Sequence, residues 1–320
     1  MTEYQTTLAA HEPIAITIGN FDGVHLGHQR LMHELSALAQ QLGCKPVLVT
    51  FKPHTLNVIR PEIQAQFLTT LEEKIALTRH YGKIADSIVI HFTREVASMT
   101  AEAFLDELNQ QFTIKGLIVG TDFSLGRNRT GNVAFLEQYS QARGIQFRAV
   151  ALEEAGPGRI SSTRIRNLVS EGRISEANEL LGHPMVIEGR VQHGDQRGRL
   201  LGFPTANLRP DPQKLLPANG VYVVRAHVQN GTASDSETDS PVYNGVANIG
   251  VRPTFNGKER LVEVHLLNVT LDLYDTYLSV EFIEYVRAEQ RFPGVEALKT
   301  QIASDIQRAN EILMSRRVSH

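Results

Sequence analysis

The first 180 residues alternate short apolar runs with segments of helical periodicity, and this alternation limits the fold more than any other feature. The apolar runs are rich in Ile and Val and predict strands over residues 14–18, 46–51, 84–90, 117–119 and 145–152. The first helix is predicted to start near His25, and the second to run from Thr70 to just before Gly82. Further helices are predicted over 101–112, 132–143, 162–171 and 175–181. This order predicts a doubly wound parallel sheet covered on both faces, with ligands beyond the carboxyl ends of the strands.

The pattern changes after Pro184, where alternating, strand-like runs replace the helices. Strands are predicted over 185–192, 221–228, 243–248, 261–267 and 278–286, with Gly, Pro and Asn breaks between them. One amphipathic helix follows, with an inward face of Val295, Leu298, Ile302, Ile306, Ala309 and Leu313. We therefore predict two domains, residues 1–183 and residues 184–320, the second being a small antiparallel barrel with a terminal helix. The polar run 230–240 is expected to be a mobile hairpin loop.

Composition and charge exclude several classes of protein. The 320 residues are 42% hydrophobic and 21% charged, which is typical of a globular protein, and the net charge of -3 provides no general attraction for nucleic acid. No window approaches the roughly 20 apolar residues of a membrane span, and the N-terminus lacks a signal-peptide pattern. The only cysteine, Cys44, cannot form an intrachain disulfide. We expect a cytoplasmic protein with small-molecule partners, and the sequence does not predict its oligomeric state.

The segment Gly19-Asn20-Phe21-Asp22-Gly23-Val24-His25-Leu26-Gly27-His28 joins the first predicted strand to the first helix. Such a connection favours anions, because free N–H groups and the positive end of the helix dipole meet there, and its glycines allow close approach of a ligand. His25 and His28 are three residues apart, so both imidazoles can face one phosphate chain. Metal binding or plain surface placement would explain the histidine pair alone equally well.

A second candidate segment, Arg159-Ile160-Ser161-Ser162-Thr163-Arg164-Ile165-Arg166, opens a predicted helix with hydroxyl groups and cations. Hydroxyls, free N–H groups and guanidinium groups together suit phosphate. An ordinary helix cap with solvated arginines is an equally good interpretation of this segment alone.

The barrel half carries its own candidate site. Gly198 and Gly202 flank Arg199 in a strand connection, which suggests backbone contact with phosphate, although the chain has no P-loop sequence. Thr205 and Asn207 of Pro204-Thr205-Ala206-Asn207 offer hard neutral oxygens that suit Mg²⁺, unless the tetrapeptide is simply a turn. Glu263 and His265 share one face of a predicted strand, which could also be a solvated outer face.

Taken together, the HxGH segment, the Ser-Ser-Thr-Arg-Ile-Arg segment and the Pro-Thr-Ala-Asn motif, in this order, closely resemble the bacterial bifunctional riboflavin kinase/FMN adenylyltransferase family over almost the full length of the chain. The resemblance implies that the N-terminal domain is a Rossmann-like nucleotidyltransferase that converts FMN and ATP into FAD and pyrophosphate. It implies that the C-terminal domain converts riboflavin and ATP into FMN and ADP. It also implies Mg²⁺ for both steps.

The resemblance further implies site residues. In the first domain it implies ATP binding by Gly19, Phe21, Asp22, Gly23, His25, His28, Arg159, Ser162, Thr163 and Arg166, with His28 catalytic and His54 and Asp122 on the flavin side. In the second it implies that Glu263 is the catalytic base, that Gly198, Arg199, Gly202, Thr205 and Asn207 bind ATP and its phosphates, and that Thr205 and Asn207 hold the metal.

Two motifs depart from the family. Phe-x-Pro-His-Pro ends here in Thr55, and Phe-Arg-Phe-Gly has Ser124 and Leu125 in place of its Arg and second Phe. Both lie near the expected flavin pocket, so they bear on FMN affinity more than on ATP binding. A riboflavin kinase with a weak or inactive adenylyltransferase domain is therefore the alternative function. A flavin-responsive binding protein is disfavoured by Glu263 and Thr205, and a different small-molecule nucleotidyltransferase leaves the second domain unexplained.

Overall fold

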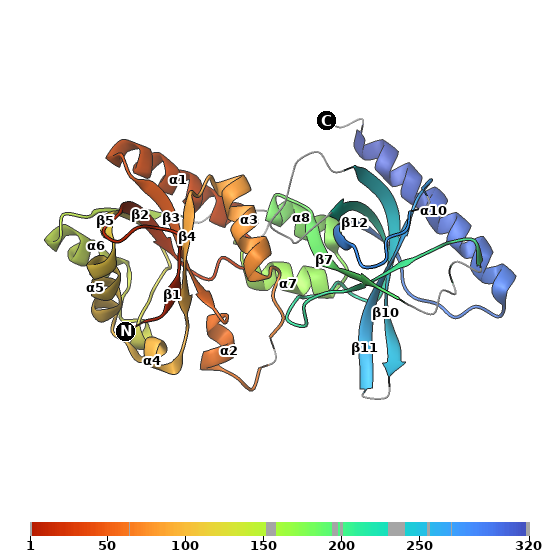
Figure 1. Ribbon diagram of the computed structural model, residues 1–320, viewed down its shortest axis with the longest axis horizontal. Helices are drawn as coiled ribbons and strands as arrows, with labels where there is room; N and C mark the ends of the chain where they lie inside the picture. The colour runs from red at the N-terminus through yellow and green to blue at the C-terminus, as the bar shows by residue number, and fades with distance from the viewer. Residues whose placement is uncertain are drawn as a thin grey trace. The chain divides into compact units, whose positions relative to one another are not determined.

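A computed structural model describes residues 2–63, 65–151, 158–193, 198, 201–229, 241–254, 257–269 and 271–317 (Figure 1). Arg199 and the run 230–240, for which we predict mobility, lie outside these residues. Residue contacts divide the chain into two compact units, Met1–Ser162 and Thr163–His320. The boundary after residue 183 stays a prediction. In the described residues, no helix is both long enough and apolar enough to cross a membrane.

The first unit is built on one six-stranded sheet with the strand order β1-β4-β3-β2-β5-β6. Its strands are β1 (Tyr4–Gln5), β2 (Pro13–Ile18), β3 (Lys45–Lys52), β4 (Asp86–His91), β5 (Thr113–Gly120) and β6 (Gln146–Val150). Strands β2 to β6 pair in parallel, whereas β1 pairs antiparallel with β4 at one edge. The predicted doubly wound parallel sheet is confirmed, and the two-residue strand β1 was too short to predict.

Helices cover both faces of this sheet. They are α1 (Leu26–Leu42), α2 (Thr55–Ile59), α3 (Leu71–Gly82), α4 (Arg94–Ser98), α5 (Ala101–Gln111) and α6 (Val133–Ala142), with a 3-10 turn η1 (Arg127–Arg129). Apolar residues of α1 pack with Ala15, Leu48 and Ile118 on one face, and those of α5 and α6 pack with Ile16 and Val49 on the other. The helices therefore leave the carboxyl ends of the central strands uncovered.

Local sequence explains where the two helices nearest the first site begin. The ring of His25 caps α1 by accepting a hydrogen bond from the His28 amide, and Gly43 ends the helix in the left-handed conformation. Thr70 and Glu73 form the predicted capping box at the start of α3. Our predicted end of α3 was one residue short, because Gly82 is still helical and Lys83 takes the left-handed cap position.

The second unit holds the short helices α7 (Ser162–Ser170) and α8 (Ile174–Leu181) and a closed six-stranded barrel. Its strands are β7 (Met185–Gln192), β8 (Ala206–Arg209), β9 (Gly220–Gln229), β10 (Val242–Thr254), β11 (Gly257–Leu266) and β12 (Tyr277–Arg287), in the order β10-β11-β8-β7-β12-β9. Every pair of neighbouring strands in the barrel is antiparallel, as predicted.

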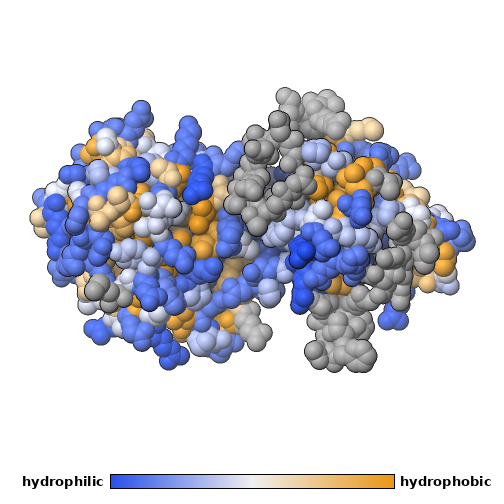
Figure 2. All heavy atoms as spheres, viewed as in Figure 1, coloured by the Kyte–Doolittle hydropathy of each residue, from blue (hydrophilic) through white to orange (hydrophobic). Residues whose placement is uncertain are grey.

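The terminal helix α10 (Val295–Arg317) lies along the outside of the barrel (Figure 1). Ala309, Ile312 and Leu313 pack against Val223 and Ile283, so this part of the barrel is buried on both of its faces. Val295, which we predicted to face inward, is 54% exposed, because the helix meets the barrel only after its first turn. Elsewhere polar residues predominate on the visible surface, with scattered hydrophobic side chains (Figure 2).

Candidate active sites

The loop that follows β2 in the first unit is tight and strained. Gly23 has a φ of 81°, and Phe21 and Val24 also have positive φ angles, 48° and 42°. Bulky and β-branched residues rarely adopt this conformation, and such strain is often held at functional sites. The strained backbone of this loop is therefore typical of a ligand-binding loop rather than of an ordinary connection between a strand and a helix.

Asp22 anchors this loop to the start of α3. Its carboxylate accepts hydrogen bonds from the amide and the hydroxyl of Thr69, at 3.1 and 3.4 Å, and the Gly23 amide donates to the Thr69 hydroxyl at 3.1 Å. Ser162 donates its hydroxyl proton to the carbonyl oxygen of Asp22 at 2.9 Å. Ser162, from the second segment that the sequence singled out, is thus in direct contact with the loop Gly19–His28, although Asp22 and Ser162 are 140 residues apart in the chain.

The two histidines of this loop lie face to face. Their rings stack with centroids 3.6 Å apart and planes 16° from parallel, so the two imidazoles lie side by side at the start of α1. The Nδ1 atom of His25 accepts the His28 amide proton, so a neutral His25 carries its proton on Nε2 and can donate it. Within the described residues, Nδ1 of His28 is buried without a hydrogen-bond partner.

Electrostatics keep His28 neutral. Burial is the main reason that the pKa of His28 lies well below its ordinary value, and the charges of His25, Lys74 and Arg159 lower this pKa further. Lys74 itself is buried at the same edge of the sheet, and burial lowers its pKa to about 8. A bound anion would offset the repulsion between these positive charges, so the local field suits phosphate.

The other residues predicted for the adenylyltransferase site are placed as follows. Arg159 pairs with Asp122 at 2.5 Å, which brings an ATP-side and a flavin-side candidate together. The ring of His54 caps α2 by accepting the Leu56 amide and stacks on Phe67 at 3.9 Å. Thr163 accepts a hydrogen bond from Arg166 at 3.2 Å on α7. Gly19 continues β2 through a 3.0 Å hydrogen bond from its amide to the Val49 carbonyl.

Two residues that depart from the family motifs, Thr55 and Ser124, each make a side-chain hydrogen bond. Thr55 accepts a hydrogen bond from the Asn20 side chain at 2.9 Å, which ties α2 to the loop after β2. Ser124 accepts one from Nε of Arg129 at 2.8 Å. Asp122, Ser124 and Arg129 line a shallow hollow of 360 Å³, so a guanidinium from η1 lies where the motif has lost its own arginine.

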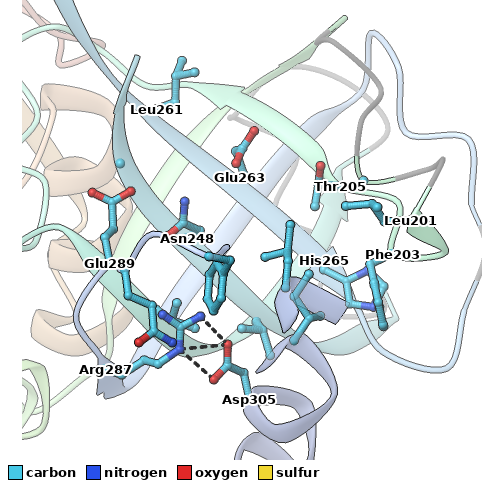
Figure 3. Close-up of a pocket in the computed structure, with 18 of the residues that line it drawn as sticks. Leu201, Phe203, Thr205, Asn248, Leu261, Glu263, His265, Arg287, Glu289 and Asp305 are labelled. Atoms are coloured by element: carbon cyan, nitrogen blue, oxygen red, sulfur yellow. Dashed lines mark hydrogen bonds and ion pairs between the residues drawn. The ribbon is translucent and has the colours of Figure 1, made fainter. Parts of the chain in front are cut away.

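The barrel carries a cavity of 510 Å³ on its outer face, beneath α10. Side chains that point out of the barrel form its floor, and Phe292, Leu298 and Ile302 supply apolar walls. Figure 3 shows Thr205, Glu263 and Asn248 around this hollow. Glu263 and His265 both line the cavity, so the strand face that could have been simply solvated is instead the floor of a pocket.

Three polar side chains cross the floor of this cavity in one row. Glu263 on β11 is the cross-strand neighbour of Asn207 on β8 and of Asn248 on β10. Direct neighbours of this kind have Cβ atoms about 4.5–5.5 Å apart and point to the same face. The sequence-predicted Glu263 and Asn207 are therefore brought together, and Asn248 joins them although the sequence alone indicated no chemistry for it.

The glycine-rich connection before β8 lies at the edge of the same cavity. Gly198 and Thr205 line it, and the Phe203 amide donates to the Gly198 carbonyl oxygen at 2.8 Å. Gly202 has a φ of 90°, which other residues rarely adopt. Thr205 also lines a second hollow of 340 Å³, bounded by Leu271 and Tyr274. Thr205 therefore lies between two cavities.

The metal prediction can be tested against the donors that are present. No group of three or more His, Cys, Asp or Glu side chains that could hold a metal ion occurs in the part of the chain that the structure describes. Thr205 and Asn207, however, offer neutral oxygens at one cavity. These donors fit a hard cation that takes its other ligands from water and phosphate, as Mg²⁺ does.

Comparisons with known proteins match both halves of the chain to known families. A family model for FAD synthetase matches residues 7–164, and one for riboflavin kinase matches residues 181–313. The bifunctional riboflavin kinase/FMN adenylyltransferase of Escherichia coli K12 is 37% identical over 304 residues, covering 95% of this chain and 94% of the relative. The Listeria monocytogenes protein of the same description is 33% identical over 315 residues, covering 94% and 96%.

Among solved structures, a Streptococcus pneumoniae protein described as a macrolide-efflux protein has a TM-score of 0.82 and 28% identity, covering 94% of each chain. Both family models, in this tandem order, and the full-length relatives lead to one conclusion. The chain belongs to the bifunctional riboflavin kinase/FMN adenylyltransferase family.

Proposed function

We propose that the barrel phosphorylates riboflavin to FMN with Glu263 as the base, and that the N-terminal domain then joins FMN to AMP from ATP to give FAD. The observation that carries the first assignment is the row of Asn207, Glu263 and Asn248 across the floor of a 510 Å³ cavity. A pocket of this size and apolar lining is typical of small-molecule sites and suits a tricyclic flavin.

In the kinase step the 5'-hydroxyl of the ribityl chain attacks the γ-phosphorus of ATP. Glu263 accepts the hydroxyl proton or orients the hydroxyl as the new bond forms. Asn207 and Asn248 flank it and hold the polar end of the flavin by hydrogen bonds, while Phe292 and Leu298 contact the ring system. Positioning of this kind supplies most of the catalysis in phosphoryl transfer.

The second hollow beside Thr205 supports the placement of the nucleotide. Its walls include Leu271 and Tyr274, which suit an adenine ring, and Thr205 is common to both cavities. The γ-phosphate would then reach the flavin cavity past Thr205, and Gly198, Gly202 and Arg199 would approach the phosphate chain. Thr205 and Asn207 would hold Mg²⁺, which when bound neutralises charge on the transferring phosphates.

In the adenylyl step an FMN phosphate oxygen attacks the α-phosphorus of ATP, and pyrophosphate leaves. No protein nucleophile is needed, so the chain's task is to position both substrates and to stabilise charge. His25 and His28 donate to the phosphate chain at the amino end of α1, together with Arg159, Ser162, Thr163 and Arg166. Gly19, Phe21, Asp22 and Gly23 shape the loop, and His54 and Asp122 lie on the flavin side.

The contact of Arg129 with Ser124 supports retention of the adenylyl activity. It keeps a cation beside Asp122 on the flavin side, where the departures from the family motif fall. A kinase with a weak adenylyltransferase domain is the alternative that the test must separate from the bifunctional enzyme.

The test is a time course of the purified chain with riboflavin, ATP and Mg²⁺, with riboflavin, FMN and FAD separated by chromatography. FMN that appears first and is followed by FAD is the expected result. FMN alone would support the alternative, and unchanged riboflavin in a folded, flavin-binding protein would overturn the enzymatic proposal. The cytoplasmic location stays a prediction from the sequence.

A further inference from the structure

Lys74 is a buried lysine for which the sites described above have no role. It lies in the first turn of α3, and only 5% of the residue is exposed. Its ammonium donates to the hydroxyl of Thr50 at 3.3 Å, near the carboxyl end of β3. The side chain therefore reaches from the helix to the edge of the sheet where ligands of doubly wound folds bind.

The charged groups that act on Lys74 or on its neighbour His28 come from four segments. Asp22, in the loop after β2, and Glu72, on α3, act on Lys74. His25, at the start of α1, and Arg159, before α7, act on His28 together with Lys74. Asp22 and Glu72 favour the charged form of Lys74, and the positive charge of Lys74 disfavours protonation of His28.

The nearby carboxylates have other partners. Asp22 accepts two hydrogen bonds from Thr69, Glu73 accepts the Thr70 amide in the capping box, and Glu72 pairs at 3.7 Å with Lys52.

The ammonium of Lys74 therefore has few hydrogen-bond acceptors among the described residues. An ammonium has three protons to donate, and the hydroxyl of Thr50 is the one acceptor that the structure shows for it among the described residues. Burial lowers the pKa of Lys74 to about 8, which measures how poorly the surrounding protein groups solvate the charge. The amino end of α1 adds further positive potential. A methionine of similar shape would avoid the free-energy cost of burying a charged ammonium, so stability alone does not explain a lysine at this position.

We propose that Lys74 is a phosphate-binding residue of the adenylyltransferase site, and that its ammonium pairs with the nucleotide's phosphates beside His25 and His28. The proposal rests on the proposed adenylyl transfer. In that reaction the bond from the α-phosphorus to the bridging oxygen breaks, and its electron pair leaves with pyrophosphate. A fixed cation at this place stabilises the charge that the leaving group gains.

The experiment measures FAD formation from FMN, ATP and Mg²⁺ by the full-length chain, with kcat/KM for ATP determined from pH 7 to 9.5. FMN is supplied directly, so the kinase step does not contribute. If Lys74 must be charged to bind ATP, kcat/KM should fall above pH 8, by about 25-fold between pH 7.5 and 9.5. Lys74→Arg should remove this fall, because a guanidinium keeps its charge. Lys74→Met should lower kcat/KM at pH 7.5 by more than about 30-fold.

The matched control is Lys45→Met. Lys45 lies at the opposite end of β3, where it is exposed and pairs with Glu12, so the same loss of charge should leave kcat/KM for ATP within about threefold. A wild type that makes FAD with no fall between pH 7.5 and 9.5, or a Lys74→Arg variant with the same fall, would overturn the proposal even if Lys74→Met did not fold. A wild type that makes no FAD at any pH would instead refute the adenylyltransferase function itself.

Discussion

Arg287 and Asp305 form a two-pronged ion pair at the wall of the barrel cavity, in which Nε and Nη2 of the arginine donate to the carboxylate at 2.9 and 2.7 Å (Figure 3). Arg287 ends β12 and Asp305 belongs to α10, so the pair fastens the terminal helix to the barrel. Gln301 also donates to Asp305 at 2.9 Å. The flavin cavity lies between these same two elements, so its width depends on this pair.

Asp305→Asn should therefore loosen α10 and weaken flavin binding. The Asp305 side chain is 5% exposed, and removal of one partner of a buried pair costs about 3 kcal/mol. We expect KM for riboflavin to rise at least tenfold, together with a lower melting temperature. Arg308→Met removes a solvent-exposed pair with Glu311 on the same helix and should change stability by less than about 0.5 kcal/mol. An unchanged KM in Asp305→Asn would show that the helix is held by its apolar contacts alone.

Glu263→Gln should remove the kinase activity and keep the adenylyl transfer. The amide preserves the shape and the cross-strand contacts but cannot accept the hydroxyl proton, and loss of a general base typically lowers the rate by about 10²- to 10⁴-fold. The check is to assay riboflavin to FMN and FMN to FAD separately on one preparation. Glu281→Gln, on β12 beside His227, is the control and should keep both rates. A loss of both activities in a folded Glu263→Gln protein would contradict separate sites.

The alternation of the sequence predicts most of the fold, because each strand and helix satisfies its own hydrogen bonds and buries one periodic face. The same alternation correctly predicts that Glu263 and His265 lie on one face of their strand. It misses β8, since Ala206–Arg209 is too short to show a period and resembles a turn. Because β8 was missed, the pairing of Asn207 with Glu263 was also beyond reach.

Lys74 shows a different limit. It lies on the buried face of α3 with Thr78 and Gly82, and this face carries no apolar pattern that would have marked it as buried in the sequence. Its neighbours could not be predicted either, because Thr50 and Asp22 come from other segments of the chain. Likewise, the pair of Arg287 and Asp305 spans a strand and a helix, and no local spacing predicts such a contact.

Thr205→Val should weaken the use of metal and nucleotide by the kinase. Valine has the same shape as threonine but no side-chain oxygen. We therefore expect two quantities to rise at least about tenfold: the Mg²⁺ concentration for half-maximal rate and KM for ATP. A tenfold rise corresponds to the loss of one ligand worth roughly 1.4 kcal/mol. Thr205→Ser, which keeps the hydroxyl, should lie within about threefold of the wild type. If the Thr205→Val and Thr205→Ser variants required the same Mg²⁺ concentration for half-maximal rate, Thr205 would not be a metal ligand. Removal of Mg²⁺ with a chelator should stop FMN formation in every variant.

His28→Ala should produce the reverse of the Glu263 result, with FAD formation lost and FMN formation kept. His28 stacks on His25 at the amino end of α1, so its loss removes one imidazole and leaves the stacking face of the other uncovered. We expect the rate of FMN adenylylation to fall by about 10²-fold or more. His33→Ala, on the exposed face of the same helix, should keep both rates. Normal FAD formation by His28→Ala would exclude His28 from the reaction.

His28 should also make the stability of the N-terminal domain depend on pH. Its pKa is lowered well below the ordinary value in the folded chain, whereas in the unfolded chain it titrates near 6.5. Below that pH the unfolded chain takes up a proton that the folded chain does not, so the contribution to stability is complete above pH 6.5 and is lost as the pH falls. Between pH 7.5 and 5.5 the loss is at most about 1.4 kcal/mol, the value for a ring that stays neutral in the folded chain, or roughly 3–5 °C in melting temperature.

Calorimetry of the full chain checks this, because His28→Asn removes the titrating ring and should reduce the fall in melting temperature over the same range. The variant must be compared with the wild type at both pH values, so that the difference between the two proteins isolates the contribution of His28. His33→Asn should keep the dependence of the wild type. An equal fall in the wild type and in His28→Asn would mean that the ring is solvated enough to protonate in the folded state.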